Sequence, residues 1–120
     1  MTNTAASALR AVPGPEPLER AVLAFGRRLE AEGRSPNTVS AYLRDLRTLA
    51  GVLAARRPGL TLERVTSTML DEALTDPAVT TTPDGTQRSA ASLHRFKAAV
   101  RSFFAWAEET GLVGENPARS

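Results

Sequence analysis

The feature that most constrains the fold is a helix-start signal at residues 35–36, followed by a long apolar stripe. Ser35 is a favoured N-cap residue, and Pro36 suits the first helical position, where its missing N–H costs nothing. Apolar residues then recur at helical spacing, namely Val39, Leu43, Leu46, Leu49, Ala50 and Leu53. The opposite side carries Asn37, Ser40, Ala41, Arg44, Arg47 and Thr48. Residues 36–56 are therefore predicted to form an amphipathic helix with a polar, basic outer face.

Three further helices are predicted by the same periodicity and by helix-stop signals. They cover residues 17–32, 67–74 and 88–110, and Gly33 and Gly111 end the first and the last of them. Their inner faces are formed by Leu18, Val22, Phe25 and Leu29, by Met69, Leu70 and Ala73, and by Leu93, Phe96, Val100, Phe103, Phe104 and Ala107. Residues 76–86, which include two prolines and a glycine, are predicted to be a loop. Gly51, inside the second helix, is expected to permit close helix packing.

No segment requires a β-strand, so the predicted fold class is all-α, a small four-helix bundle. The chain of 120 residues has room for one domain with a modest core. Residues 1–15 are rich in Ala, Ser and Thr and end in Val12-Pro13-Gly14-Pro15, which predicts a flexible, disordered arm. The folded domain is expected to cover residues 16–118.

Several classes of function are disfavoured by what the chain lacks. It has no cysteine and one histidine, which excludes disulfides, thiolate metal sites and multi-histidine sites, and no cofactor or metal is expected. No apolar run approaches the roughly 18 residues of a membrane span, and the first residues do not read as a secretory signal. A cytoplasmic protein without a membrane partner is the expectation. No nucleophile–base pair or phosphate loop is found, so this chain is not expected to be an enzyme.

The charges are segregated along the chain, although the formal net charge is only +2. Residues 27–57 are mainly basic, and residues 88–101 contain Arg88, Arg95, Lys97 and Arg101 without an acid. Segregated basic helices favour an anionic partner, most commonly a nucleic acid. The other interpretation is that these are ordinary solvated helix faces, and charge alone does not separate the two.

Two blocks of sequence carry a family resemblance. The first is Ser35-Pro36-Asn37-Thr38 followed by Tyr42, Asp45 and Leu46, and the second runs from Ser92-Leu93-His94-Arg95 through residues 100–106 and Gly111 to Asn116-Pro117-Ala118. In order and spacing they resemble the N-terminal core-binding (SAM-like) domain of tyrosine recombinases, the Xer-type recombinases and phage integrases. The resemblance covers about residues 18–118. It implies a DNA-binding helical domain whose catalytic domain would follow residue 120 in a parent recombinase.

The resemblance also implies a DNA-contacting face. By position, Ser35, Asn37 and Thr38 would meet phosphates through their side chains and the free amides of the first helical turn. Ser40, Ala41 and Arg44 would lie nearest the bases, with Arg47 further along the same side. On the last helix, Arg88, Ala91, Ser92 and Arg95 would face the groove, and Arg95 is the candidate for reading a guanine. Partners implied in this way are double-stranded DNA, the catalytic domain of the same parent protein and, for the full-length protein, a tetramer on DNA.

Other interpretations of these residues remain open. Ser35 and Thr38 are also explained by helix capping, and Arg101 by a bond across the bundle. Trp106 is explained by packing against the first helix, or by stacking on another protomer or on a catalytic domain. For the chain as a whole, the alternatives are a helical protein-interaction module and a stand-alone DNA-binding regulator. The reading frame beyond residue 120 would separate the last of these from a recombinase domain.

Overall fold

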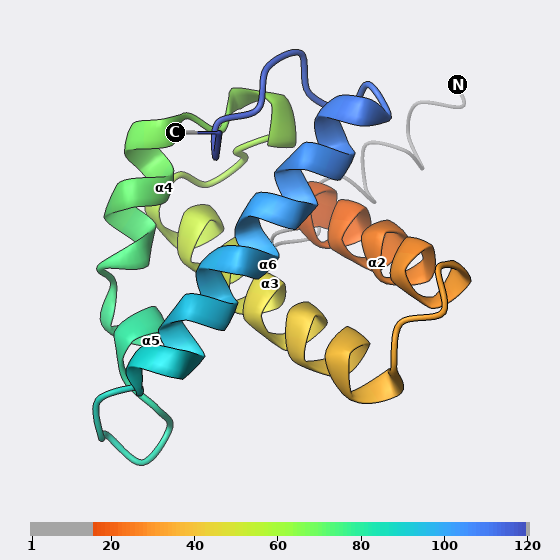
Figure 1. The fold of residues 1–120 in the computed structure, drawn as a ribbon. Coiled ribbons are helices and arrows are strands. Elements are labelled where there is room, and N and C mark those ends of the chain that lie inside the picture. Colours follow the sequence, from red (N-terminus) through yellow and green to blue (C-terminus); the bar gives the residue numbers. More distant parts are fainter. Residues whose placement is uncertain (1–15, 120) are drawn as a thin grey trace, which may run out of the picture.

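The computed structural model describes residues 16–119, so the predicted arm at 1–15 lies outside the described residues. The elements follow in the order α2 (Glu16–Ala31), α3 (Pro36–Arg56), a 3₁₀ turn η1 (Leu62–Arg64), α4 (Ser67–Leu74), α5 (Pro77–Thr80) and α6 (Ala90–Glu109) (Figure 1). Within this range the only β-type pairing is an isolated bridge between Thr81 and Gln87. The all-α prediction is confirmed, and its four helices correspond to α2, α3, α4 and α6.

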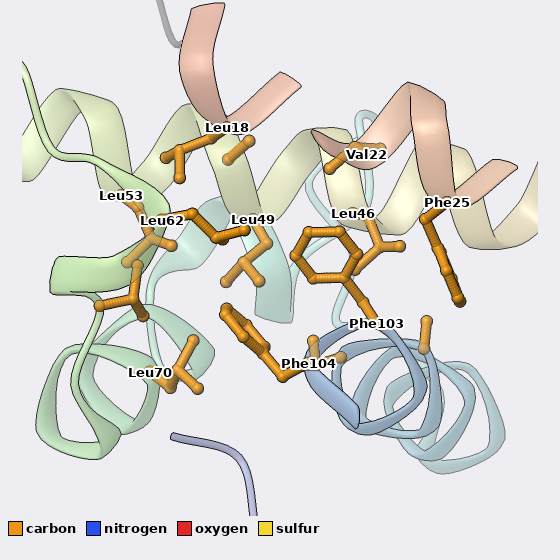
Figure 2. Packing of buried hydrophobic residues seen from close by; sticks show 14 of the residues in the cluster. Leu18, Val22, Phe25, Leu46, Leu49, Leu53, Leu62, Leu70, Phe103 and Phe104 are labelled. Atoms are coloured by element: carbon orange, nitrogen blue, oxygen red, sulfur yellow. The ribbon is translucent and has the colours of Figure 1, made fainter. Parts of the chain in front are cut away.

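The hydrophobic core lies where α2, α3 and α6 face one another, with η1 and α4 closing one side (Figure 2). Its largest buried contributions come from Leu18, Val22, Phe25 and Leu29 of α2, Leu46, Leu49 and Leu53 of α3, and Phe96, Phe103 and Phe104 of α6. These are the apolar stripes predicted from helical periodicity. Burying each such side chain stabilises the fold by roughly 1.5–3 kcal/mol before the loss of conformational entropy is counted.

The start of α6 differs from the prediction because Ser89 acts as its N-cap. The Ser89 Oγ accepts a hydrogen bond from the Ser92 amide at 3.1 Å, so the helix begins at Ala90 rather than at residue 88. Arg88 therefore lies just before the helix, and its backbone N–H donates to the Thr80 carbonyl at 2.8 Å. This bond ties the entry of α6 to the end of α5.

The predicted loop at 76–86 was wrong over its first part, which forms the one-turn helix α5. Asp76 is the N-cap, its Oδ1 accepting a hydrogen bond from the Ala78 amide at 2.9 Å, and Pro77 occupies the first helical position. Val79 is fully buried and anchors this turn to the core. A cap–proline pair and one buried valine are thus enough to order a segment that its composition marks as a loop.

The expected role of Gly51 was also wrong. Gly51 is exposed, and a Cβ atom added there would meet nothing within 4 Å. The close approach between α2 and α3 occurs instead at Gly26, where an added Cβ would lie 2.8 Å from Leu43 Cδ2. Gly51 therefore weakens α3 locally without a packing benefit on the described surface.

Trp106 of α6 packs against α2, the first helix, as predicted from the sequence. Its ring centroid lies 5.4 Å from that of Phe25 and 5.8 Å from that of Phe103. Beyond α6 the chain folds back through Gly111, which has a φ of 83°, and Val113 is buried against the core. The indole is half-buried and is held inside the domain.

Candidate nucleic-acid interface

The first turn of α3 is an exposed helix N-terminus with a hydroxyl cap. The Ser35 Oγ accepts a hydrogen bond from the Thr38 amide at 3.2 Å and donates one to the Thr38 Oγ1 at 2.9 Å. The first turn contains no acidic residue, and Ser35, Pro36 and Asn37 are exposed. The positive end of the helix dipole is therefore open to solvent, an arrangement that favours anions. The capping role of Ser35 is confirmed.

A row of exposed polar side chains continues along α3 from this turn. Asn37, Ser40, Arg44 and Arg47 are all exposed, and Thr38 and Ala41 beside them are half-buried. The Arg47 Nε lies 3.5 Å from the Glu19 Oε1 of α2, whereas Arg44 has no ion pair with any described residue. An open hollow of about 480 Å³ lies along the row, lined by Ser40, Leu43, Arg44, Arg47 and Thr48. The structure thus places the predicted α3 residues on one continuous outer surface, with Arg44 as its unpaired cation.

A buried carboxylate joins this helix to α6. Asp45 of α3 is 1% exposed, and it receives hydrogen bonds from Arg95 Nε at 3.0 Å and Arg95 Nη2 at 3.2 Å. Both carboxylate oxygens are used, so the pair is bidentate and fixes the plane of the guanidinium. The Arg95 side chain is 36% exposed, so one part of it is held in the interior and another part remains at the surface.

Arg88 is the second cation at the same carboxylate. Its Nη1 lies 3.5 Å from Asp45 Oδ1 and donates to the Ser92 Oγ at 3.2 Å, while its guanidinium carbon stands 5.5 Å from the centre of the Phe96 ring. The Arg88 side chain is only 14% exposed, and its Nε is buried without a hydrogen-bond partner among the described residues. Of the predicted α6 set, the structure therefore gathers Arg88 and Arg95 around Asp45, Ser92 is bonded to Arg88, and Ala91 is exposed.

The charges at this junction do not cancel. Two guanidinium groups share one carboxylate, which leaves one positive charge in excess between α3 and α6. In Figure 1, α3 passes behind α6, and the N-terminal ends of the two helices emerge on either side of the crossing. Ala41, one turn before Asp45 on α3, links the exposed row to this junction. The predicted residues of both helices are therefore connected through a side chain that was not predicted.

Sequence reasoning missed the structural role of Asp45, although a signal was present. Asp45 follows Tyr42 by three residues and precedes Leu49 by four, so it lies on the inner side of α3. An acidic residue at a core position requires a cationic partner, because an unpaired buried carboxylate is strongly unfavourable. The candidate partners on the last predicted helix were Arg88, Arg95, Lys97 and Arg101.

A second basic stripe lies on the outer flank of α6. His94, Lys97 and Arg101 are exposed there, and neither Lys97 nor Arg101 has an ion pair within residues 16–119. The expected bond of Arg101 across the bundle is therefore absent from this part of the chain. Lys97 and Arg101 border a groove of about 230 Å³ between α6 and α4, into which Pro117 and Ala118 also face.

Two kinds of site are absent from the described range. It holds no group of three or more His, Asp or Glu side chains placed to bind a metal ion. It also has no helix that is both long enough and apolar enough to cross a membrane.

Comparison with known proteins supports a family assignment. Residues 23–111 match the family model of the phage integrase N-terminal SAM-like domain. The chain is 38% identical over 102 residues to the tyrosine recombinase XerC of Mycobacterium sp. (strain JLS), which is 84% of this chain and 32% of that protein. It is 38% identical over 86 residues to XerC of Mycobacterium tuberculosis (strain ATCC 25177 / H37Ra), 72% of this chain and 26% of that protein. The chain thus spans about a third or less of these curated relatives. No solved structure is significantly similar to it.

Proposed function

This chain belongs to the family of phage integrase N-terminal SAM-like domains, and we propose that it binds duplex DNA as the core-binding domain of a tyrosine recombinase. In this proposal, α3 and α6 contact one face of the duplex. A catalytic domain of the same parent protein, which would follow residue 120, supplies the strand-cutting residues. The chain itself binds and does not cut. The cytoplasmic location expected from the sequence and a tetramer of the parent protein on DNA are parts of the same proposal.

The observation that carries the proposal is the exposed polar row of α3 together with the bidentate Asp45–Arg95 pair, which joins α3 to the first turns of α6. Arg44 is exposed and unpaired among the described residues, and the junction of Asp45 with Arg88 and Arg95 adds one excess positive charge. Asn37 and Ser40 supply neutral hydrogen-bonding groups on the preceding turns of α3. Such a mixture of cations and short polar side chains suits a phosphate backbone and the edges of bases.

The proposed contacts divide by chemistry. Ser35, Asn37 and Thr38 act on phosphates together with the free amides of the first turn of α3, because a helix N-terminus attracts anions. Arg44 neutralises a phosphate or reaches a base next to Ser40 and Ala41, and Arg47 extends the row. Ala91 and Arg95 approach the groove from α6, where a small residue permits close approach. Arg88 and Ser92 are more enclosed, and their direct contact with DNA stays a prediction.

Binding by this domain alone is expected to be weak and salt-dependent. If about five phosphates are neutralised, log K falls with a slope of about −4 to −5 against log salt concentration. The dissociation constant is expected in the non-specific range of roughly 10⁻⁴ to 10⁻⁶ M at physiological salt. A catalytic domain on the other face of the duplex would add the remaining affinity.

An amide chemical-shift titration of the ¹⁵N-labelled chain with a generic DNA duplex tests the proposal. The expected shifts are confined to residues 35–47 and 88–95, and they fade as salt is raised from low to moderate concentration. Absence of any shift at low salt would contradict DNA binding and favour the protein-interaction module. Shifts confined to the stripe of His94, Lys97 and Arg101 would support DNA binding but reject the proposed face.

A further inference from the structure

We propose that Asp45 is a positioning residue, which holds the Arg95 guanidinium so that its free edge binds a base. This inference rests on the proposed function, because it concerns how one residue of the DNA-binding face is prepared for contact. Asp45 itself does not touch DNA: it is 1% exposed, and both of its carboxylate oxygens are occupied by arginine donors.

The geometry leaves one defined edge of Arg95 available. A guanidinium is planar and carries its N–H donors in a fixed fork. Asp45 takes the edge formed by Nε and Nη2, at 3.0 and 3.2 Å. The end edge, formed by Nη1 and the second hydrogen of Nη2, is bonded by no described residue, and the side chain is 36% exposed. Two parallel donors on a rigid plane match the O6 and N7 acceptors of guanine in the major groove.

Arg88 completes the arrangement from the interior side. It is held by the Ser92 Oγ and lies over the Phe96 ring, and its Nη1 remains 3.5 Å from Asp45. Because Arg88 contributes a second positive charge, the carboxylate stays compensated while the outer edge of Arg95, still held by Asp45, binds an acceptor. The pair of arginines therefore retains an excess positive charge at the point of contact.

This preparation distinguishes Arg95 from Arg44. Arg44 is exposed and makes no ion pair with the described residues, so it loses side-chain freedom when it binds. Arg95 is already restrained by its bidentate bond in the free protein. A donor pair in a fixed orientation binds only an acceptor that lies at the matching position. A flexible cation can reorient and bind a phosphate at many positions. The structure therefore assigns sequence preference to Arg95 and general attraction to Arg44.

The test measures the base preference of each protein variant. Each variant selects bound duplexes from the same pool of random-sequence duplexes, and the selected sequences are compared. Arg95→Ala and Asp45→Asn are expected to lower discrimination at one base pair by about fivefold to about 150-fold, the range for a bidentate base contact. Asp45→Asn raises the net charge by one, so its overall affinity for DNA should be kept or increased. Glu109→Gln is the matched control, because it raises the charge equally and lies 14 helix positions from Arg95, about 21 Å along α6.

The outcomes separate this inference from the proposed function. Asp45→Asn with the wild-type preference would overturn the positioning role. A wild-type chain that binds DNA without any base preference would also overturn it, while DNA binding itself would stand. A wild-type chain that binds no DNA at low salt would remove the proposed function, and this inference with it. A drop in preference in Glu109→Gln that equals the drop in Asp45→Asn would overturn the inference by making charge the cause.

A measurement on the wild-type chain covers the case in which Asp45→Asn fails to fold. The Arg95 Nε–Hε group is expected to exchange slowly with water and to stay slow when a duplex is added, because Nε remains on Asp45. The Arg44 Nε–Hε group provides the internal reference for an exposed arginine. Exchange of Arg95 at the rate of Arg44 in the DNA complex would show that it leaves Asp45, and would overturn the inference.

Discussion

Asp45 of α3 and Arg95 of α6 are 50 residues apart in the sequence, and they meet in a bidentate ion pair at 3.0 and 3.2 Å. The carboxylate is buried, whereas the guanidinium reaches the surface. A pair of this kind both ties two helices together and fixes the orientation of one surface cation. Stability and binding are therefore coupled at this position, and each must be measured separately.

Stability depends on both partners of this pair. Asp45→Asn and Arg95→Ala are each expected to lower the free energy of unfolding by about 1–3 kcal/mol, because each leaves a hydrogen-bonding charge without its partner. The double variant should lose less than the sum of the two, since both single changes remove the same interaction. Urea unfolding followed by circular dichroism measures all three. Strictly additive losses would show that the two side chains do not stabilise the fold through each other.

Arg44 should govern the salt dependence of DNA binding. Arg44→Ala removes an exposed cation that is unpaired among the described residues, and it should reduce the slope of log K against log salt by about one. Fluorescence anisotropy of a labelled duplex over a salt series gives the slope. Arg64→Ala is the control: it removes an equal exposed charge on η1, which follows the C-terminal end of α3, away from its first turn. An equal change in both variants would mean that net charge, not the α3 surface, determines binding.

Two glycines are expected to respond in opposite directions to alanine. Gly51 lies inside α3 and is exposed with nothing near an added Cβ, so Gly51→Ala should raise stability by about 0.5–1 kcal/mol. Gly33 has a φ of 81° after α2, a conformation that alanine disfavours, so Gly33→Ala should lower stability by about 1 kcal/mol. Thermal unfolding measures both. Destabilisation by Gly51→Ala would reveal a contact at this surface that the described fold lacks.

Asp84 should titrate at unusually low pH. Hydrogen bonds from the Thr82 and Thr86 hydroxyls and the Thr86 amide lower the pKa of the Asp84 carboxyl from 3.8 to about 2. Because the folded-state pKa lies below the unfolded value, this group stabilises the loop above pH 3.8, and the contribution is lost as pH falls toward 2. Carbon-detected NMR of the carboxyl follows the titration. Thr86→Val should move the midpoint upward, and an unchanged midpoint would contradict the assigned cause.

The parts of the fold that could be predicted from the sequence depend on local signals. Ser35 and Pro36 mark the start of α3, and the apolar period alone indicates which of its sides is buried. The role of Gly51 could not be obtained in this way, because close helix approach depends on where two helices cross. The crossing places Gly26 against Leu43 and leaves Gly51 in solvent.

The candidate site could be predicted only in part, for a related reason. Positions on one helix face follow from spacing, so the exposed row of α3 was foreseeable, although its contact with DNA is still a prediction. The pairing of Asp45 with Arg88 and Arg95 joins residues from distant segments, and no local pattern specifies it. Arginine is usually a surface residue, so Arg88 and Arg95 were predicted to face outward. The buried Asp45 carboxylate instead binds both guanidinium groups and holds them partly inside the domain.

Ser35→Asp separates the two roles of the α3 cap. Aspartate caps a helix as well as serine does, so the free energy of unfolding should change by no more than about 0.5 kcal/mol. The added negative charge at the first turn should repel phosphate and weaken DNA binding, most strongly at low salt. Thr66→Asp is the matched control, because Thr66 caps α4 in the same way: its Oγ1 accepts a hydrogen bond from the Met69 amide at 3.2 Å. Anisotropy titrations of both variants against one duplex measure the difference. Equal weakening by the two variants would mean that the first turn of α3 does not meet the phosphates.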